Sequence, residues 1–358
     1  MNYKELVLAA IEHQPIQSLP FDVYEGWMWP DIKSRLIKRF GLNHYEELLI
    51  HFGVYCRWVE AMYVGPPLPE GANGRVASPH TTHSLNFCIW GLEPGLRGHG
   101  LRSSGHPLSH VQSEKDILEY PWPSPDWFDY KELNQRAHQY KDYFVVVGGF
   151  SPIFYLIADL CGMEKTLMDM VTNPEVIKSL VYKISEFYEG YFSRIAETCV
   201  GNVDAIAFGD DFSGQLAMLF SPQFWREYFR DAWAKLFSIA KKYGYKVMFH
   251  SCGSVHKVIP DLVEIGLDVL YPIQTQAASM DISKLHHEFG KHLAFYGAID
   301  VQQLLAFGTP HEIEREVSRI AQVFEREGGY ILSTSHVIMD DVPEENVLAL
   351  YKAVRNIY

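Results

Sequence analysis

Short apolar runs alternate with longer amphipathic segments from about residue 145 onward, and this alternation constrains the fold more than any other feature of the sequence. Apolar runs bounded by turn residues are typical of buried strands, and the segments between them are long enough for helices. The expected strands are Phe144 to Val147, Asp204 to Phe208, Tyr245 to Phe249, Val269 to Tyr271, Leu293 to Tyr296 and Tyr330 to Leu332. Strands and helices in this order predict an α/β protein with a parallel sheet.

The expected helices begin and end with residues suited to those positions. Ser221-Pro222 and Thr309-Pro310 each place a capping side chain before a proline in the first helical turn, and Glu312 completes a capping box. Gly244 and Gly328 follow expected helices, where glycine allows the backbone conformation that ends a helix. These signals agree with the helix positions that the apolar pattern predicts.

Two further strands are expected near Leu19 to Tyr24 and Val54 to Val59, which gives the eight strands that close a parallel barrel. A barrel of this kind with insertions reaches 358 residues as one domain. We therefore predict a single (β/α)8 TIM-barrel domain over residues 1–358, with an N-terminal helical extension. Residues 65–129 are rich in Gly, Pro, His and Ser, and they predict an irregular insertion that covers one barrel end.

Composition and charge exclude several classes of function. The net charge is −13 and the sequence shows no cluster of Lys and Arg, so no nucleic-acid surface is expected. We expect no contact with a membrane, because no apolar stretch approaches the roughly 18 residues of a membrane span and the first residues do not form a signal peptide. The five scattered cysteines are typical of reduced thiols in a cytoplasmic protein.

Polar side chains follow five of the expected strands at their carboxyl ends. In a β/α barrel the reactive groups gather at that rim, so these residues are candidates for a common site. They are Asp210 and Asp211, His250 and Cys252, Gln274, Asp300 and His336.

His250 and Cys252, which flank Ser251, are the candidate metal ligands. Zn²⁺ is the commonest metal to bind a thiolate together with an imidazole nitrogen, although an isolated pair of this kind is more often part of a core. The other polar strand ends favour a metal site. We expect His336 as the third ligand, because the last strand closes beside the first. Asp210 or Asp211 could instead supply a carboxylate ligand, or orient a ligand imidazole.

The remaining strand-end residues suggest a substrate pocket. Tyr24, Trp27 and Trp29 follow the first strand and would form an apolar wall, or else plug the barrel mouth. Gln274 and Tyr296 are further candidates for substrate binding.

A zinc ion at this rim would act as a Lewis acid on a substrate oxygen or sulfur, which suits methyl transfer from a heteroatom. Asp210, Asp211 and Asp300 are the candidate catalytic residues, because expulsion of an alkoxide or phenoxide requires neutralisation of charge at the leaving oxygen.

Several motifs form a set that resembles a known family. They are Gly209-Asp210-Asp211, His250-Ser251-Cys252-Gly253, Tyr296-Gly297-Ala298-Ile299-Asp300, Phe307-Gly308-Thr309-Pro310 and Asp341-Val342-Pro343-Glu344-Glu345-Asn346. With them the chain resembles the uroporphyrinogen decarboxylase superfamily, and within it the cobalamin-dependent methyltransferases. The resemblance implies a β/α barrel and a zinc site in which His250 and Cys252 form the His-x-Cys pair.

The chain also departs from the patterns of these relatives. The third ligand of the thiol-methylating members resembles a cysteine, whereas the equivalent loop here offers His336, which argues against a thiol acceptor. The decarboxylases carry an arginine after the first strand, whereas residues 25–30 here read Glu-Gly-Trp-Met-Trp-Pro. A porphyrinogen with many carboxylates needs clustered cations, so the sequence does not favour that substrate.

The resemblance implies methyl transfer between a methylated small molecule, expected to be an O-methyl compound, and a corrinoid. We find no Asp-x-His-x-x-Gly corrinoid-binding pattern, so a separate corrinoid-binding protein would carry the cobalamin. A metal-free decarboxylase and a non-catalytic barrel that binds a ligand or a corrinoid protein are the alternatives. Decarboxylase relatives form dimers, so a homodimer is compatible with the resemblance.

Overall fold

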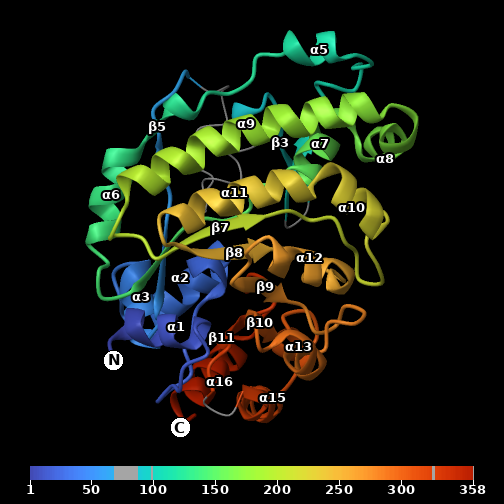
Figure 1. The fold of residues 1–358 in the computed structure, drawn as a ribbon. Coiled ribbons are helices and arrows are strands. Elements are labelled where there is room, and N and C mark those ends of the chain that lie inside the picture. Colours follow the sequence, from blue (N-terminus) through green and yellow to red (C-terminus); the bar gives the residue numbers. More distant parts are fainter. Residues whose placement is uncertain (68–87, 98–99, 325–326, 358) are drawn as a thin grey trace.

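The centre of the molecule is a parallel sheet of seven strands in the order β1-β6-β7-β8-β9-β10-β11 (Figure 1). The structure is a computed structural model that describes residues 1–67, 88–97, 100–324 and 327–357. The strands are β1 (Cys56–Val59), β6 (Phe144–Gly148), β7 (Ala205–Gly209), β8 (Lys246–His250), β9 (Val269–Ile273), β10 (Ala294–Ile299) and β11 (Tyr330–Thr334). Each coincides with an expected strand.

The segment around Phe21 closes the sheet into a barrel. Phe21 forms a parallel bridge with Leu332 of β11, and the Asp22 N–H donates to the Leu332 carbonyl at 2.9 Å. On the other side, the Tyr55 N–H donates to the Phe21 carbonyl at 2.9 Å, just before β1. Residues 20–22 therefore serve as the expected first strand, and the predicted TIM-barrel fold is confirmed.

Helices surround the barrel (Figure 1). The N-terminal helical extension consists of α1 (Tyr3–Ile11), with α2 (Pro30–Arg39) and α3 (Tyr45–Phe52) after the closing segment. The other helices are α6 (Tyr130–His138), α7 (Phe154–Cys161), α8 (Met163–Thr172), α9 (Pro174–Thr198), α10 (Pro222–Tyr228), α11 (Arg230–Lys242), α12 (Ile259–Glu264), α13 (Ile282–Phe289), α14 (Leu304–Phe307), α15 (Pro310–Phe324) and α16 (Glu344–Arg355). Short 3-10 turns are η1 (Tyr24–Gly26), η2 (Pro125–Trp127) and η3 (His256–Val258). In the described part of the chain, no helix combines the length and hydropathy that a membrane span requires.

The predicted helix starts are present. The Ser221 hydroxyl accepts from the Phe224 N–H at the start of α10. At the start of α15, Thr309 and Glu312 form the predicted capping box, with the Glu312 carboxylate accepting from the Thr309 N–H at 2.8 Å.

The segment 65–129 is partly regular. Its described residues form the antiparallel hairpin of β3 (Glu93–Arg97) and β4 (Gly100–Ser104), and the helix α5 (Glu114–Leu118), which packs on α9. A small strand, β5 (Phe128–Asp129), pairs with β2 (Met62–Tyr63). Residues 68–87 and 98–99 lie outside the described part of the chain. The division of the chain into one domain with an insertion stays a prediction.

Alternate strand residues face opposite sides of the sheet, as the two-residue period of a strand requires. In β7, Ala205 and Ala207 belong to the cluster inside the barrel, whereas Ile206 and Phe208 belong to the layer beneath the helices. The small side chains of β7 leave room inside the barrel for larger ones on other strands, including Tyr271 and Tyr296.

A buried carboxylate anchors the closing segment inside the barrel. Asp22 is 1% exposed, and its Oδ2 accepts hydrogen bonds from Trp58 Nε1 at 2.8 Å and from the Tyr296 hydroxyl at 3.0 Å. Burial raises the pKa of Asp22 to about 7, although these donors oppose the shift. Asp22 is therefore a group whose protonation couples to the stability of the barrel.

We expect Asp22→Asn to change the pH dependence of stability. The folded-state pKa of about 7 lies above the ordinary 3.8, so folding favours the protonated carboxyl. The stability of the wild type is therefore highest, as far as Asp22 decides it, below about pH 4, and it falls as the pH rises toward 7. The asparagine of the variant does not titrate, so the free energy of unfolding of the variant should rise relative to that of the wild type over this pH range, by an amount on the order of 4 kcal/mol. Urea unfolding at several pH values measures this difference, and a pH-independent difference would contradict the assignment.

Candidate metal centre

The candidate ligands His250 and Cys252 lie where β8 ends and the chain turns. Because Phe249 packs beneath the helices, the next side chain, His250, points into the barrel. The Ser251 N–H donates to the Tyr271 carbonyl at 2.8 Å and continues the sheet for one residue. Gly253 then adopts a φ of +83°, and a Cβ there would lie 2.6 Å from the Gly214 carbonyl oxygen. The turn therefore requires glycine directly after Cys252.

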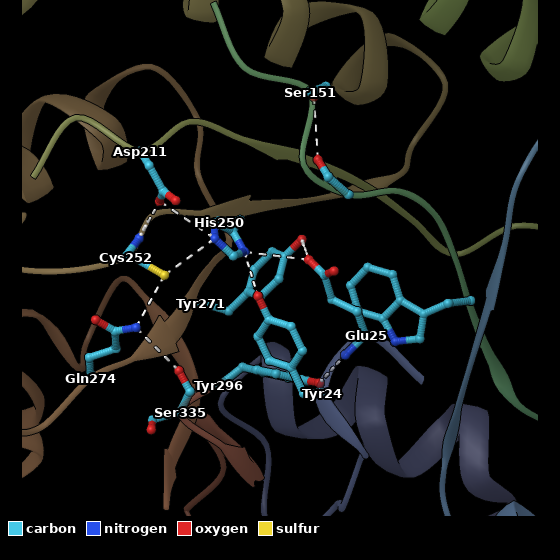
Figure 2. Close-up of polar contacts among 12 residues, drawn as sticks. Tyr24, Glu25, Ser151, Asp211, His250, Cys252, Tyr271, Gln274, Tyr296 and Ser335 are labelled. Carbon is cyan, nitrogen blue, oxygen red and sulfur yellow. Dashed lines mark hydrogen bonds and ion pairs between the residues drawn. The ribbon is translucent and has the colours of Figure 1, made fainter. Parts of the chain in front are cut away.

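Three potential ligand atoms converge at this turn. His250 Nε2 lies 3.6 Å from Cys252 Sγ and 3.6 Å from Asp211 Oδ1. One ligand atom from each of the three residues lies within 4.8 Å of the others, so the group could hold a metal ion. The Cys252 N–H donates to Asp211 Oδ1 at 2.7 Å, which fixes the loop after β7 against the loop after β8. Figure 2 shows Asp211 and Cys252 on one side of the His250 ring.

Gln274 supports the sulfur. Its Nε2 donates to Cys252 Sγ at 3.1 Å, and its Oε1 accepts from the Gly253 N–H at 2.9 Å. The amide thus contacts both the thiol and the backbone turn that carries it, and it holds the sulfur on the side of His250 and Asp211 (Figure 2).

The other side of the imidazole faces a different set of groups. His250 Nδ1 lies 3.1 Å from the Tyr24 hydroxyl and 3.4 Å from Glu25 Oε1. Glu25 Oε1 also accepts a hydrogen bond from the Tyr271 hydroxyl at 3.0 Å. The two ring nitrogens of His250 therefore have separate environments, with Nδ1 toward Glu25 and Nε2 toward Cys252 (Figure 2).

The ionisable groups of this cluster shift one another's pKa values. Burial alone lowers the pKa of His250, but Cys252, Asp211 and Glu25 together raise it well above its usual value. Burial alone raises the pKa of Asp211, yet His250 and the Cys252 N–H hold it below its usual value. Burial and Asp211 raise the pKa of the Cys252 thiol. A cation bound here would have to displace the thiol proton.

Asp210 and Asp300, both expected to be catalytic, are oriented away from the cluster. The Asp210 carboxylate accepts hydrogen bonds from three backbone N–H groups at the start of α7, at 2.7 to 3.1 Å. Burial raises the pKa of Asp210 to about 7, although these donors oppose the shift. Asp300 accepts from three N–H groups at the start of α14, at 2.9 to 3.1 Å. Both carboxylates cap helices.

His336 is not one of the three residues whose ligand atoms converge, although its charge helps to lower the pKa of Asp211. His336 is half-buried, and its ring stacks on Tyr24 with centroids 5.0 Å apart. The group of close ligand atoms in the described residues contains Asp211 in its place. The sequence left open whether a histidine or an aspartate is the third ligand. The geometry favours the aspartate Asp211.

The expected substrate-binding residues occupy two kinds of position. Trp27 and Trp29 are half-buried and contact each other edge to face, with ring centroids 5.5 Å apart. Tyr24 is buried and its hydroxyl meets His250. Tyr296 is fully buried, where its hydroxyl donates to Asp22 and accepts from the Glu25 N–H. Tyr296 therefore supports the inside of the barrel, beneath the cluster.

Glu25 is the residue of this site that the sequence did not single out. Residues 25–30 were compared with the decarboxylase pattern for an arginine, so the acidic residue at their start received no role. Its position directly before Gly26 and next to Tyr24, at the end of the first strand, was the available signal.

Comparison with known proteins identifies the family. The family model described as uroporphyrinogen decarboxylase (URO-D) matches residues 130–357. The chain belongs to the uroporphyrinogen decarboxylase family. The family resemblance inferred from the motifs is thereby confirmed.

Two curated relatives, both named uroporphyrinogen decarboxylase, match parts of the chain. The protein from Vesicomyosocius okutanii subsp. Calyptogena okutanii (strain HA) is 36% identical over 76 residues, which cover 21% of each chain. The protein from Wolinella succinogenes is 23% identical over 189 residues, which cover 52% of this chain and 51% of that protein. The matched regions thus span about a fifth and about half of the length of these relatives.

A solved structure shares the fold over nearly the whole chain. The methyltransferase from Methanosarcina mazei superimposes with a TM-score of 0.64 at 18% identity, covering 99% of this chain and 98% of that one. This similarity shows that the two proteins have a common fold. The common fold covers nearly all of this uroporphyrinogen decarboxylase family member, including the residues before 130.

The donor set of the cluster fits zinc. An imidazole, a thiol and a carboxylate are the ligand types that Zn²⁺ binds, and catalytic zinc sites use three protein ligands with a fourth position open to substrate. His250 and Cys252 stand in the spacing expected of the pair, and Asp211 completes a set of three.

We expect Asp211→Asn to lower zinc affinity more than the roughly 10–100-fold that loss of an outer partner costs, because a charged ligand is removed. His336→Gln is the matched control and should leave the affinity near that of the wild type. Competition with a chromogenic zinc chelator measures both. Retention of zinc by Asp211→Asn together with its loss from His336→Gln would instead make His336 the third ligand.

Proposed function

We propose that this chain is a zinc-dependent methyltransferase that moves a methyl group between a methylated small molecule and a corrinoid carried by a separate protein. The observation that carries the proposal is the convergence of Asp211, His250 and Cys252 where the loops after β7 and β8 meet. Membership of the uroporphyrinogen decarboxylase family and the fold shared with a methyltransferase support it. A cytoplasmic location and the corrinoid-binding partner belong to the same proposal.

His250, Cys252 and Asp211 would hold the zinc ion, which when bound supplies a Lewis acid for the substrate heteroatom. Gln274 donates to Cys252 Sγ and would stabilise the sulfur as a thiolate. One thiolate and one carboxylate balance the two charges of the cation, so the metal and its ligands together would be close to neutral, and Glu25 adds a negative charge behind His250. A site without excess positive charge suits an uncharged methyl ether better than a substrate with many carboxylates.

The aromatic residues at the end of the first strand are proposed to bind the methylated substrate. Trp27 and Trp29 are half-buried, so part of each residue packs against the protein and part stays accessible to a ligand. Tyr24 lies between His250 and His336, and it would shape the pocket next to the zinc site. Because Asp210 and Asp300 cap helices, we assign them the positioning of the loops and not a proton transfer.

Decarboxylation of a porphyrinogen is the alternative that the family name raises. The cluster itself argues against that substrate. Glu25 and Asp211 place two acidic side chains beside His250, and they would repel substrate carboxylates that need cationic partners. A metal-free decarboxylase would also be indifferent to chelators, which separates the two proposals experimentally.

We expect the purified, zinc-loaded chain to convert cob(I)alamin to methylcobalamin with at least one member of a panel of methyl ethers. The methyl carbon leaves the ether oxygen for cobalt, whose electron pair forms the new bond, and the oxygen retains the old pair and takes a proton. Absorbance spectroscopy follows the cobalamin. Cys252→Ala should reduce the rate to background, because the sulfur ligand is lost.

Cys199→Ala is the matched control, since Cys199 is a buried thiol next to the end of α9 and should leave the rate unchanged. Two results would contradict the proposal. One is full methyl transfer by Cys252→Ala, and the other is chelator-resistant decarboxylation of a porphyrinogen by the wild type.

A further inference from the structure

Glu25 combines burial with an uncommon backbone conformation. It is 3% exposed, and its φ of 45° and ψ of 29° lie in the left-handed region that side chains other than Gly, Asn and Asp rarely adopt. Gly26 follows at a φ of +69°. Residues in such conformations persist where the surrounding structure holds them, and they gather at functional sites.

The surroundings of Glu25 account for this conformation. Its N–H donates to the Tyr296 hydroxyl at 3.0 Å, and that hydroxyl donates in turn to Asp22 Oδ2 at 3.0 Å. A Cβ at Gly26 would lie 3.2 Å from Trp58 Cδ1, so the turn packs closely on β1. The barrel interior therefore fixes the backbone of Glu25 from below.

This backbone places the carboxylate against one nitrogen of His250. Glu25 Oε1 lies 3.4 Å from His250 Nδ1 and accepts from the Tyr271 hydroxyl at 3.0 Å. Without a metal, Glu25 at Nδ1 and Asp211 at Nε2 together favour the doubly protonated ring. An imidazole that binds a cation is neutral and carries one proton, and with Asp211 engaged by that cation the carboxylate of Glu25 holds the proton at Nδ1. The lone pair of Nε2 then points toward Cys252 and Asp211, as a metal ligand requires.

We propose that Glu25 is a positioning residue that fixes the tautomer and ring orientation of His250 for metal binding. The inference rests on the proposed zinc centre and adds a residue behind it. Tyr24 also reaches Nδ1, at 3.1 Å, but its neutral hydroxyl can accept or donate and so does not by itself select a tautomer. The charge of Glu25 makes the selection.

Glu25→Gln tests this role, because it keeps the shape of the side chain and removes the charge. Zinc affinity should fall about 10–100-fold, the range for loss of an outer partner of a metal-bound histidine. The metal-free variant should keep most of its thermal stability, because Asp211 still faces His250 after residue 25 loses its charge. Tyr24→Phe is the matched control, and it should reduce affinity less.

The tautomer gives a second readout. Two-bond proton–nitrogen NMR correlations of the zinc-loaded wild type should show a single form of the His250 ring with its proton at Nδ1, and zinc-loaded Glu25→Gln should show a mixture of ring forms. If Glu25→Gln does not fold, Glu25→Asp, which shortens the reach of the carboxylate and tolerates the left-handed backbone, replaces it.

Wild-type zinc affinity in Glu25→Gln, or a parallel loss of affinity and metal-free stability, would overturn the inference while the zinc centre stands. A wild type that binds no zinc would overturn the zinc centre itself, and with it the metal-binding role of Glu25. The NMR and affinity measurements need no substrate or partner, so they separate these outcomes from any failure of the methyl-transfer assay.

Discussion

Closure of the barrel by the segment around Phe21 is the constraint on which the site depends. The hydrogen bonds of this segment to β11 on one side and to Tyr55 on the other fix the direction in which the chain leaves the barrel. That exit carries Tyr24 and Glu25 onto a histidine more than two hundred residues away in the sequence. The buried contacts of Asp22 hold the closure from inside. Fold and site therefore share one set of interactions.

In the closed barrel, the two nitrogens of the His250 ring contact different kinds of group. The Nε2 side meets a thiol and a carboxylate, which are groups that bind a cation. The Nδ1 side meets Glu25 and Tyr24, which hold the ring. In a barrel the chemistry resides in loops at the carboxyl ends of strands, so a family can change its substrate while its fold persists. In this chain the loop after the first strand carries Glu25 to that rim.

The fold could be predicted from the sequence, because strands and helices follow from apolar periodicity and capping residues, and with it the strand ends that bring the candidate residues together. The orientation of individual carboxylates could not. Asp210 and Asp211 are neighbours, yet Asp210 turns to the N–H groups of α7, more than fifty residues away, while Asp211 turns to His250. The sequence did not decide between Asp211 and His336 as a ligand, because that choice also depends on the orientation of the side chains. Glu25 was missed because its role depends on a turn that only the closed barrel defines.

X-ray absorption spectroscopy at the zinc edge of the purified, zinc-loaded chain tests the central claim most directly, since it reports the atoms bound to the metal. The account predicts one sulfur at about 2.3 Å with the other ligands nitrogen or oxygen, and loss of that sulfur signal in Cys252→Ala. A wild-type spectrum without sulfur would contradict the metal centre, and with it the proposed methyl transfer.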